Sequence, residues 1–275
     1  MRASLLTIDV GNSAAKLRAW SVDPAGALSC ASRLDVTSAD PAGTVLAEFF
    51  DGNPGLELAA MSSVSGAEIT SNWRSLVGAR TRARLFAELD CGLANRTLEP
   101  ERVGRDRLFA ARGALECLGE SAIVIDVGTA ITVDALLTAK SERSKDAWRR
   151  GEFLGGAIAP GPQLLARALA SGTARLFEVV PTTAPRALGR DTSEAMHAGI
   201  GVGIRGAVRE LALEIAREAG FDDPPIALTG GARAFVVAAF GARRVLDSED
   251  LVHLGLCAAL LEEAGQPRPA AFGAR

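Results

Sequence analysis

The stretch Leu5-Leu6-Thr7-Ile8-Asp9-Val10-Gly11-Asn12-Ser13 decides the fold, because Ala122-Ile123-Val124-Ile125-Asp126-Val127-Gly128-Thr129-Ala130 repeats its plan. Each stretch is an apolar run typical of a buried strand, and an aspartate, a glycine and a small polar residue follow it. Glycine permits positive φ angles and close backbone approach, while carboxylates bind a cation or its waters. One copy alone would indicate no more than an ordinary Asp-Gly turn. Two copies in matching contexts favour a duplicated fold with one phosphate-and-metal site between the halves.

The segments that follow the two stretches are alike, which predicts an α/β protein made of two similar halves. The first half predicts strands at 5–10, 16–22, 28–34 and 58–62, an apolar piece at 84–89, and helices at 41–50 and 65–76. The second half predicts strands at 122–127, 131–138, 152–159 and 226–229, and helices at 160–170, 192–219 and 232–240. We expect a first half over 1–118, a second half over 119–264 and a flexible tail over 265–275.

Composition excludes several classes of protein. The chain has 275 residues, 48% of them hydrophobic, and a net charge of −3, so it can build a sizeable core and has no basic face for nucleic acid. Its four cysteines form no C-x-x-C pair, which indicates free thiols in a reducing compartment, and two histidines argue against a His/Cys zinc site. No apolar run approaches the roughly 20 residues of a membrane span, and no secretion signal is recognisable. We therefore expect a cytoplasmic protein that binds neither nucleic acid nor membrane.

A third informative segment, Val103-Gly104-Arg105-Asp106-Arg107, leads into a predicted helix at 108–118. Asp106 lies near the helix N-terminus, where a carboxylate can cap the free N–H groups. The same carboxylate can instead accept a proton from a substrate hydroxyl while Arg105 or Arg107 binds an anionic group. The sequence leaves both roles open.

Other segments carry weaker signals. The pairs Gly155-Gly156 and Pro160-Gly161 indicate close backbone approach and a tight corner. Leu228-Thr229-Gly230-Gly231 is a strand end whose amides could face an adenine nucleotide. Thr192 is a candidate N-cap for the predicted helix that it begins. The charged stretch Ala139–Arg150 is expected to be a solvated hairpin loop.

Together these motifs resemble one known family. DVGNS, VGRDR, DVGTAITVD, GGAIAPG, GRDTSEAM and LTGG occur in the order, and near the spacing, found in type III pantothenate kinases, from about Leu5 to about Leu261. Each motif is weak alone, but the set is specific. The resemblance implies the duplicated ribonuclease-H-like fold of the actin-like ATPase superfamily, with two mixed-sheet halves and flanking helices. It also implies ATP-dependent phosphorylation of pantothenate to 4'-phosphopantothenate, the first step of coenzyme A biosynthesis.

The resemblance further implies roles for individual residues. The ATP phosphates would be bound by Asp9, Val10, Gly11, Asn12, Ser13, Ala14, Ala15, Lys16 and Thr129. Pantothenate would be contacted by Gly104, Arg105, Asp106, Arg107 and Thr192, with Asp106 as the proton acceptor. Asp126 would bind a monovalent cation, K⁺ or NH4⁺, and Asp9 is the candidate ligand for Mg²⁺. The resemblance also implies a homodimer whose two subunits share the substrate pocket. The apolar face from Met196 to Ile215 is the candidate for the subunit interface, or it is part of the core.

Four positions depart from the family pattern. Ser13 replaces a threonine but keeps the hydroxyl, and Ile131 replaces a threonine and removes one possible ligand. The chain has no tyrosine, so Thr97 stands near the position of a substrate-facing tyrosine, and Arg105 replaces a small residue. The last two changes affect the expected acceptor pocket. They keep open a related kinase for another small hydroxyl compound, or a nucleotide-binding regulatory homologue without catalysis, although the three retained carboxylates argue against the latter.

Overall fold

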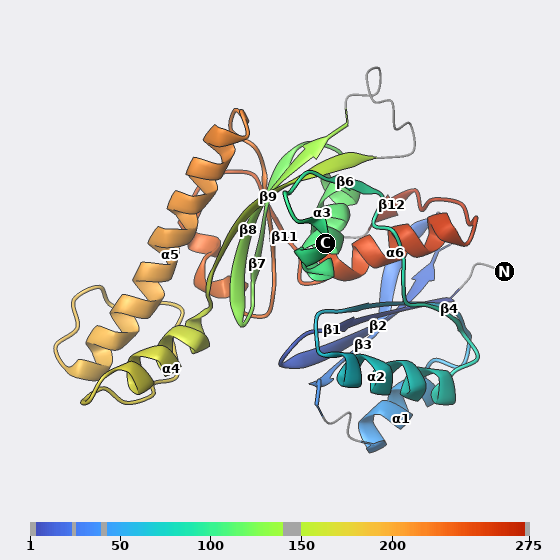
Figure 1. Cartoon of the computed structure of the whole chain (residues 1–275), viewed down its shortest axis with the longest axis horizontal. Coiled ribbons are helices and arrows are strands. Elements are labelled where there is room, and N and C mark those ends of the chain that lie inside the picture. Colours follow the sequence, from blue (N-terminus) through green and yellow to red (C-terminus); the bar gives the residue numbers. More distant parts are fainter. Residues whose placement is uncertain (1–3, 24–25, 40–42, 140–149, 273–275) are drawn as a thin grey trace.

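Two six-stranded mixed sheets frame the molecule, with helices on their outer faces and between them (Figure 1). The computed structural model describes residues 4–23, 26–39, 43–139 and 150–272. The loop predicted at 139–150 lies almost entirely outside these ranges. Within them, no helix combines the length and the apolar character that crossing a membrane requires.

In the first sheet, the central strand β1 (Ser4–Val10) pairs antiparallel with β2 (Ala14–Val22), and β2 pairs antiparallel with β3 (Ala27–Thr37). On its other side β1 pairs parallel with β4 (Leu56–Ser63), which pairs with β5 (Arg84–Phe86). Helices α1 (Gly43–Asp51) and α2 (Ala67–Arg80) cover one face (Figure 1). Strand β1 is apolar on both faces because both are buried: Leu6 and Ile8 pack with α1 and α2, and Leu5 packs in the opposite cluster.

The second sheet repeats this connectivity. Strand β7 (Ala122–Val127) pairs antiparallel with β8 (Ala130–Thr138), and β8 pairs antiparallel with β9 (Gly151–Pro160). On its other side β7 pairs parallel with β10 (Ile226–Thr229), which pairs with β11 (Val245–Asp247). Helix α4 (Pro162–Gly172) follows β9, and α5 (Thr192–Glu218) lies along the sheet (Figure 1). The predicted duplicated ribonuclease-H-like fold is therefore confirmed.

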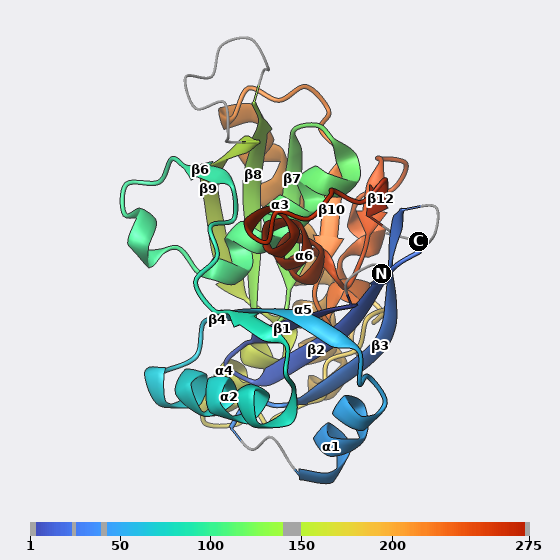
Figure 2. The same ribbon diagram turned by 90° about the vertical axis from the view of Figure 1, so that its right-hand side faces the viewer.

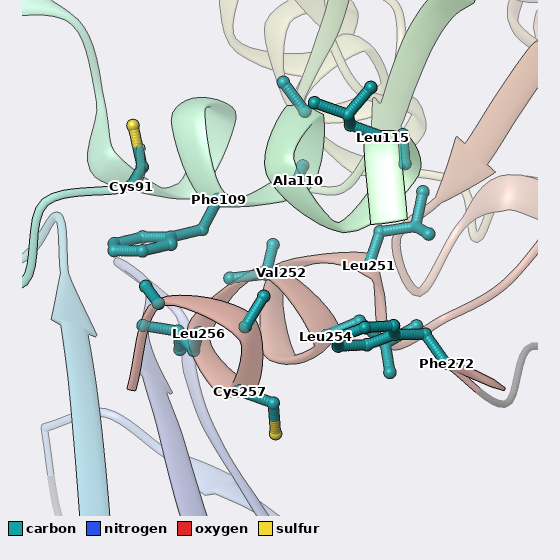
Figure 3. Close-up of a cluster of buried hydrophobic side chains, with 14 of the residues drawn as sticks. Cys91, Phe109, Ala110, Leu115, Leu251, Val252, Leu254, Leu256, Cys257 and Phe272 are labelled. Carbon is teal, nitrogen blue, oxygen red and sulfur yellow. The ribbon is translucent and has the colours of Figure 1, made fainter. Parts of the chain in front are cut away.

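Two helices, one from each half, cross between the sheets (Figure 2). They are α3 (Arg105–Leu118) and α6 (Leu251–Glu263), and their apolar side chains form the central core (Figure 3). At the crossing, a Cβ on Gly113 would overlap the carbonyl oxygen of Leu251, and a Cβ on Gly255 would overlap that of Phe109. The two backbones can approach this closely only because glycine has no side chain. The crossing fixes the start of α3 relative to both sheets.

Two short strands, which the sequence did not predict, join the halves. Strand β6 (Leu93–Asn95) pairs with β9 of the second sheet, and β12 (Ala271–Phe272) pairs with β3 of the first. Phe272 is buried in the central core, so the segment expected to be a flexible tail contains a strand. The helix predicted at 232–240 consists of two 3-10 helices, Arg233–Phe235 and Val237–Ala239. A further 3-10 helix, Pro100–Arg102, precedes α3.

The apolar face of α5 belongs to the core of the second half. Met196, Ile200, Ile204 and Val208 are buried in one cluster with side chains of β7 and β8. The interpretation of this face as a subunit interface is therefore wrong, because a sheet of the same chain already covers it. The helix is capped by Asp191, whose side chain accepts a hydrogen bond from Glu194 N at 2.8 Å, and not by Thr192.

Candidate active site

The first corner (Asp9–Ser13) and the second corner (Asp126–Ala130) face each other from the two halves. Ser13 Oγ and Thr129 Oγ1 lie 3.1 Å apart. Both corners are closed by a backbone hydrogen bond: Gly11 N and Gly128 N each donate to the carbonyl oxygen of the residue that begins the next strand, at 3.0 and 2.9 Å, although the first turn is one residue longer. The structure thus brings together the two stretches that the sequence singled out.

The first corner is braced from outside by two hydroxyl groups. Ser38 Oγ and Ser65 Oγ each donate to Gly11 O at 2.6 Å. The carbonyl oxygen of the turn therefore has two donors before any ligand binds. This bracing holds the turn that leads to Asn12 and Ser13 in one conformation.

At the corners, the carboxylates of Asp9, Asp106 and Asp126 and the ammonium group of Lys16 influence one another electrostatically. Burial, and next the negative charge of Asp106, raise the pKa of Asp9 from 3.8 to about 7, while Lys16 opposes the rise. Burial likewise raises the pKa of Asp126 from 3.8 to about 6, again against the influence of Lys16. Asp9 and Lys16 are direct neighbours on β1 and β2. A cation bound here would favour the charged forms and lower both pKa values.

Two buried oxygen atoms beside the first corner lack partners. Among the described residues, neither Asp9 Oδ1 nor Ser62 Oγ has a hydrogen-bond partner, and the two residues are neighbours on β1 and β4. Carboxylate and hydroxyl oxygens suit a hard cation such as Mg²⁺. The described part of the chain has no group of three or more His, Cys, Asp or Glu side chains arranged to hold a metal ion. A cation here would therefore need further oxygen atoms, from water or from a phosphate ligand.

Gly230 makes room for the carboxylate of the second corner. Its φ is +92°, and a Cβ there would overlap Asp126 Oδ1 and lie 2.6 Å from the carbonyl carbon of Val127. Thr229, which precedes it, lies beside Asp126 on the neighbouring strand. The sequence linked the segment Leu228–Gly231 only to a nucleotide, but its glycine also shapes the carboxylate site.

Asp106 lies in the first turn of α3. Its Oδ1 accepts a hydrogen bond from Arg107 N at 2.8 Å, and a Cβ on Gly104 would overlap the same oxygen. Burial raises the pKa of Asp106, and the Arg107 N–H and guanidinium oppose this rise. The helix cap residue is Gly104, and no side chain caps it. Asp106 is thus a mostly buried carboxylate within the electric field of Asp9.

The two arginines that flank Asp106 point to different surroundings. Arg107 donates from Nε and Nη2 to the two carboxylate oxygens of Asp134, at 3.2 and 2.5 Å. Arg105 donates from Nη2 to Leu89 O at 2.7 Å, and its guanidinium lies 5.3 Å from the centre of the Phe109 ring. Of the two candidates for binding an anionic group, Arg107 therefore acts on Asp106 and faces β8 of the second sheet, whereas Arg105 faces the loop at Leu89.

A hollow of about 450 Å³ lies beside Arg107. Its lining comes from the loop before α3 and from the double glycine of β9, and the residues are Thr97, Leu98, Glu99, Arg102, Val103, Arg107, Gly155 and Gly156. Arg105 lines a different hollow, with Leu89 and Phe109. Thr97, at the position where a tyrosine is expected, therefore faces the space that a substrate beside Arg107 would use.

Thr192, like Arg105, lies apart from the other predicted site residues. It is exposed at the start of α5, which begins beside α4 and far from α3 (Figure 1). Conversely, sequence reasoning gave no role to Asp134 or Ser62. Asp134 could have been found, because it is a charged residue at an inward position of an apolar strand. Ser62 carries no such signal.

Comparison with known proteins supports the same family. A sequence model described as type III pantothenate kinase matches residues 5–214. A type III pantothenate kinase from Thermomicrobium roseum is 40% identical over 142 residues, which are 52% of this chain and 50% of that protein. One from Halorhodospira halophila is 46% identical over 121 residues, 44% of this chain and 43% of that protein. The chain spans about half the length of the curated relatives it matches.

Among solved structures, a conserved protein of the Baf family of transcriptional activators from Campylobacter jejuni matches with a TM-score of 0.56. The match covers 94% of this chain and 98% of that one at 19% sequence identity. At this identity the likeness establishes the shared fold alone.

Proposed function

The chain belongs to the type III pantothenate kinase family, and we propose that it transfers the γ-phosphoryl group of ATP to the primary hydroxyl of pantothenate. One observation carries this proposal: Asp9, Asp106 and Asp126, from three separate segments, share one electrostatic field where the two corners meet. Phosphoryl transfer needs this combination of anion positioning, charge neutralisation and a proton acceptor. The product would be 4'-phosphopantothenate, at the start of coenzyme A synthesis.

We assign the nucleotide phosphates to the first corner, from Asp9 to Lys16, and to Thr129 of the second. The buried oxygens of Asp9 and Ser62, which lack partners among the described residues, fit Mg²⁺ or its water ligands. When bound, Mg²⁺ would neutralise the charge of the triphosphate. Lys16 supplies a fixed positive charge beside Asp9. We further assign a monovalent cation, K⁺ or NH4⁺, to Asp126, whose burial favours a bound positive charge.

Asp106 is the proposed proton acceptor. Its raised pKa brings it closer to the range in which a carboxylate can accept and release a proton during turnover. The Arg107 N–H holds one oxygen of the carboxylate, which leaves the other oxygen for the acceptor hydroxyl. Most of the rate gain would come from alignment of the hydroxyl with the phosphate, because the transition state of phosphoryl transfer is loose.

We also propose that the enzyme is a cytoplasmic homodimer in which Thr192 acts in the pocket of the second subunit. The position of Thr192, away from α3 of its own chain, supports this role. The four cysteines are free thiols, which supports a reducing compartment. Mixing Asp106→Asn with Thr192→Ala tests the shared pocket, because a mixed dimer would regain one intact site. Two inactive variants that stay inactive after subunit exchange would argue against it.

ADP release coupled to a spectroscopic readout tests the function itself. We expect turnover that requires pantothenate, Mg²⁺ and K⁺ or NH4⁺ together. Asp106→Asn should lower turnover by about 10²–10⁴-fold while leaving nucleotide binding intact, as for loss of a general base. Near-normal turnover of this variant would remove Asp106 from its role, and a silent wild-type enzyme would contradict the assigned acceptor.

A related kinase for another small hydroxyl compound is the second candidate. The observation that favours it is Thr97, which lines the hollow beside Arg107 in place of the expected tyrosine. Testing a panel of small hydroxy acids in the same ADP assay separates the two candidates. Activity with another acceptor and none with pantothenate would favour the second.

A further inference from the structure

The pair formed by Arg107 and Asp134 joins the two halves at the acceptor side of the site. Arg107 belongs to the first turn of α3, and Asp134 belongs to β8 of the second sheet. The two side chains are only 13% and 2% exposed, and they form two hydrogen bonds. The guanidinium also lies 5.4 Å from the centre of the Phe153 ring. A planar guanidinium held at one edge by a carboxylate and over a ring has a fixed orientation.

The sheet is built to accept the Asp134 carboxylate. Gly156 is the direct neighbour of Asp134 on β9. A Cβ on Gly156 would lie 2.6 Å from Asp134 Oδ1 and would overlap the carbonyl oxygen of Val133. Burial raises the pKa of Asp134, while Arg107 and a hydrogen bond from Thr132 oppose this rise and favour the charged carboxylate. The double glycine of β9 therefore has two results: it makes space for the carboxylate, and it opens the hollow on whose wall Arg107 lies.

Stability alone is a weak explanation for this pair. Burying two charges costs desolvation energy that their attraction often does not recover, so an apolar pair would serve a core equally well. In contrast, the pair uses only one edge of the guanidinium. Among the described residues, the hydrogen bonds of Arg107 side-chain nitrogens come from Nε and Nη2, so Nη1 stays available, and Arg107 lines the hollow. Hydrogen bonds between a guanidinium and a carboxylate are strong and directional.

We propose that Asp134 is a positioning residue that fixes Arg107 so that its free edge selects acceptors carrying a carboxylate group. This role rests on the proposed function, because it concerns the acceptor of the same site. Asp134 touches neither nucleotide nor acceptor and acts only through Arg107. An arginine without this support would keep its charge but lose its fixed direction, and selection for the carboxylate would weaken.

The test compares two acceptors, pantothenate and its neutral primary amide, which lacks the carboxylate. In Asp134→Asn, we expect KM for pantothenate to rise about tenfold or more, as for loss of one oriented charge-assisted hydrogen bond. KM for the amide and for ATP should change by less than about threefold. The ratio of kcat/KM values between the two acceptors is the decisive quantity, because a general loss of folded protein would lower both equally.

Glu116→Gln is the matched control. Glu116 forms a buried pair with Arg112 in the same helix, where the two side chains are 1% and 2% exposed, and also binds Arg268, but it lies at the opposite end of α3. We expect it to lower the unfolding temperature without changing the acceptor ratio. If Asp134→Asn does not fold, Arg107→Lys replaces it, because lysine keeps the charge and lacks the planar fork. Combining Arg107→Lys with Asp134→Asn should add no further loss of selection.

The outcomes separate the two proposals. Wild-type enzyme that phosphorylates no acceptor overturns the kinase assignment and this role together. Wild-type enzyme that prefers pantothenate, with the same acceptor ratio in Asp134→Asn or Arg107→Lys, overturns the positioning role alone. A ratio that falls toward one in these variants, but not in Glu116→Gln, supports it.

Discussion

Replacing Asp9 by asparagine should stabilise the ligand-free protein while it destroys activity. The residue is half-buried, one of its carboxylate oxygens is buried without a partner among the described residues, and its pKa is raised from 3.8 to about 7. At about 1.4 kcal/mol per unit, this difference corresponds to about 4 kcal/mol of destabilisation above pH 7. Because the residue is partly exposed, water reduces the effect, so we expect Asp9→Asn to raise the free energy of unfolding by about 2 kcal/mol at pH 8.

The pH dependence has a defined sign. The folded protein holds the Asp9 proton up to about pH 7, whereas the unfolded chain releases it near pH 3.8. Between these values the folded state binds more protons, so the wild-type free energy of unfolding loses this contribution as the pH rises. The difference between Asp9→Asn and wild type should therefore be small near pH 4, grow through the window and become constant above about pH 7.

Urea unfolding at several pH values, in the absence of nucleotide and metal, measures this difference. Asp222→Asn changes an exposed aspartate and is the control, for which we expect a constant small difference from wild type. Added Mg²⁺ and ATP should stabilise wild type and not Asp9→Asn. Equal or lower stability of Asp9→Asn at pH 8 would refute the reasoning, because the carboxylate would then carry no burial cost.

Three further predictions follow from individual residues. Gly113→Ala should lower the free energy of unfolding by about 3 kcal/mol, because its Cβ would overlap the backbone of α6. Gly203→Ala, in open space on α5, should raise it by about 0.5–1 kcal/mol. Thermal unfolding measures both changes. Arg105→Ala should cost about 1–2 kcal/mol of stability in the same assay but leave KM for the acceptor within about twofold, because the guanidinium binds a loop carbonyl. Gly230→Ala should slow ADP formation about tenfold or more by displacing the second-corner carboxylate, while Gly231→Ala, with no atom near its Cβ, should not.

The repeated pattern in the sequence predicted most of the fold, because each sheet is organised around one buried central strand. Apart from their aspartates, β1 and β7 are mostly apolar on both faces, and each ends in Asp-Val before a glycine turn. The short strands β6 and β12 were not predictable. Three and two residues are too few to show periodicity, and both pair with strands of the opposite half. Their positions depend on how the halves pack, which local sequence does not encode.

The candidate site was predicted as separate segments, and the structure supplied the relations between them. Asp9, Asp106 and Asp126 were each recognised from a local motif, and they share one electrostatic field. The roles of the two arginines were not separable, because neighbouring positions of a helix face different directions. Only the packing of α3 against the loop at Leu89 and against β8 assigns Arg105 to one hollow and Arg107 to another.

The two halves carry a buried charge at one pair of matching positions, and the residue beside that charge differs between them. On the second strand of each sheet, a buried charge faces the helix of the other half: Arg18 binds Asp250 just before α6, and Asp134 binds Arg107 at the start of α3. The neighbour of Arg18 on β3 is Arg33, whose guanidinium also pairs with Asp250 and occupies the space there. The neighbour of Asp134 on β9 is Gly156, which has no side chain and lines the hollow beside Arg107. The duplicated architecture thus provides two matching charged pairs between the halves, and the absence of a side chain at residue 156 opens the hollow beside Arg107 that we propose as the acceptor site.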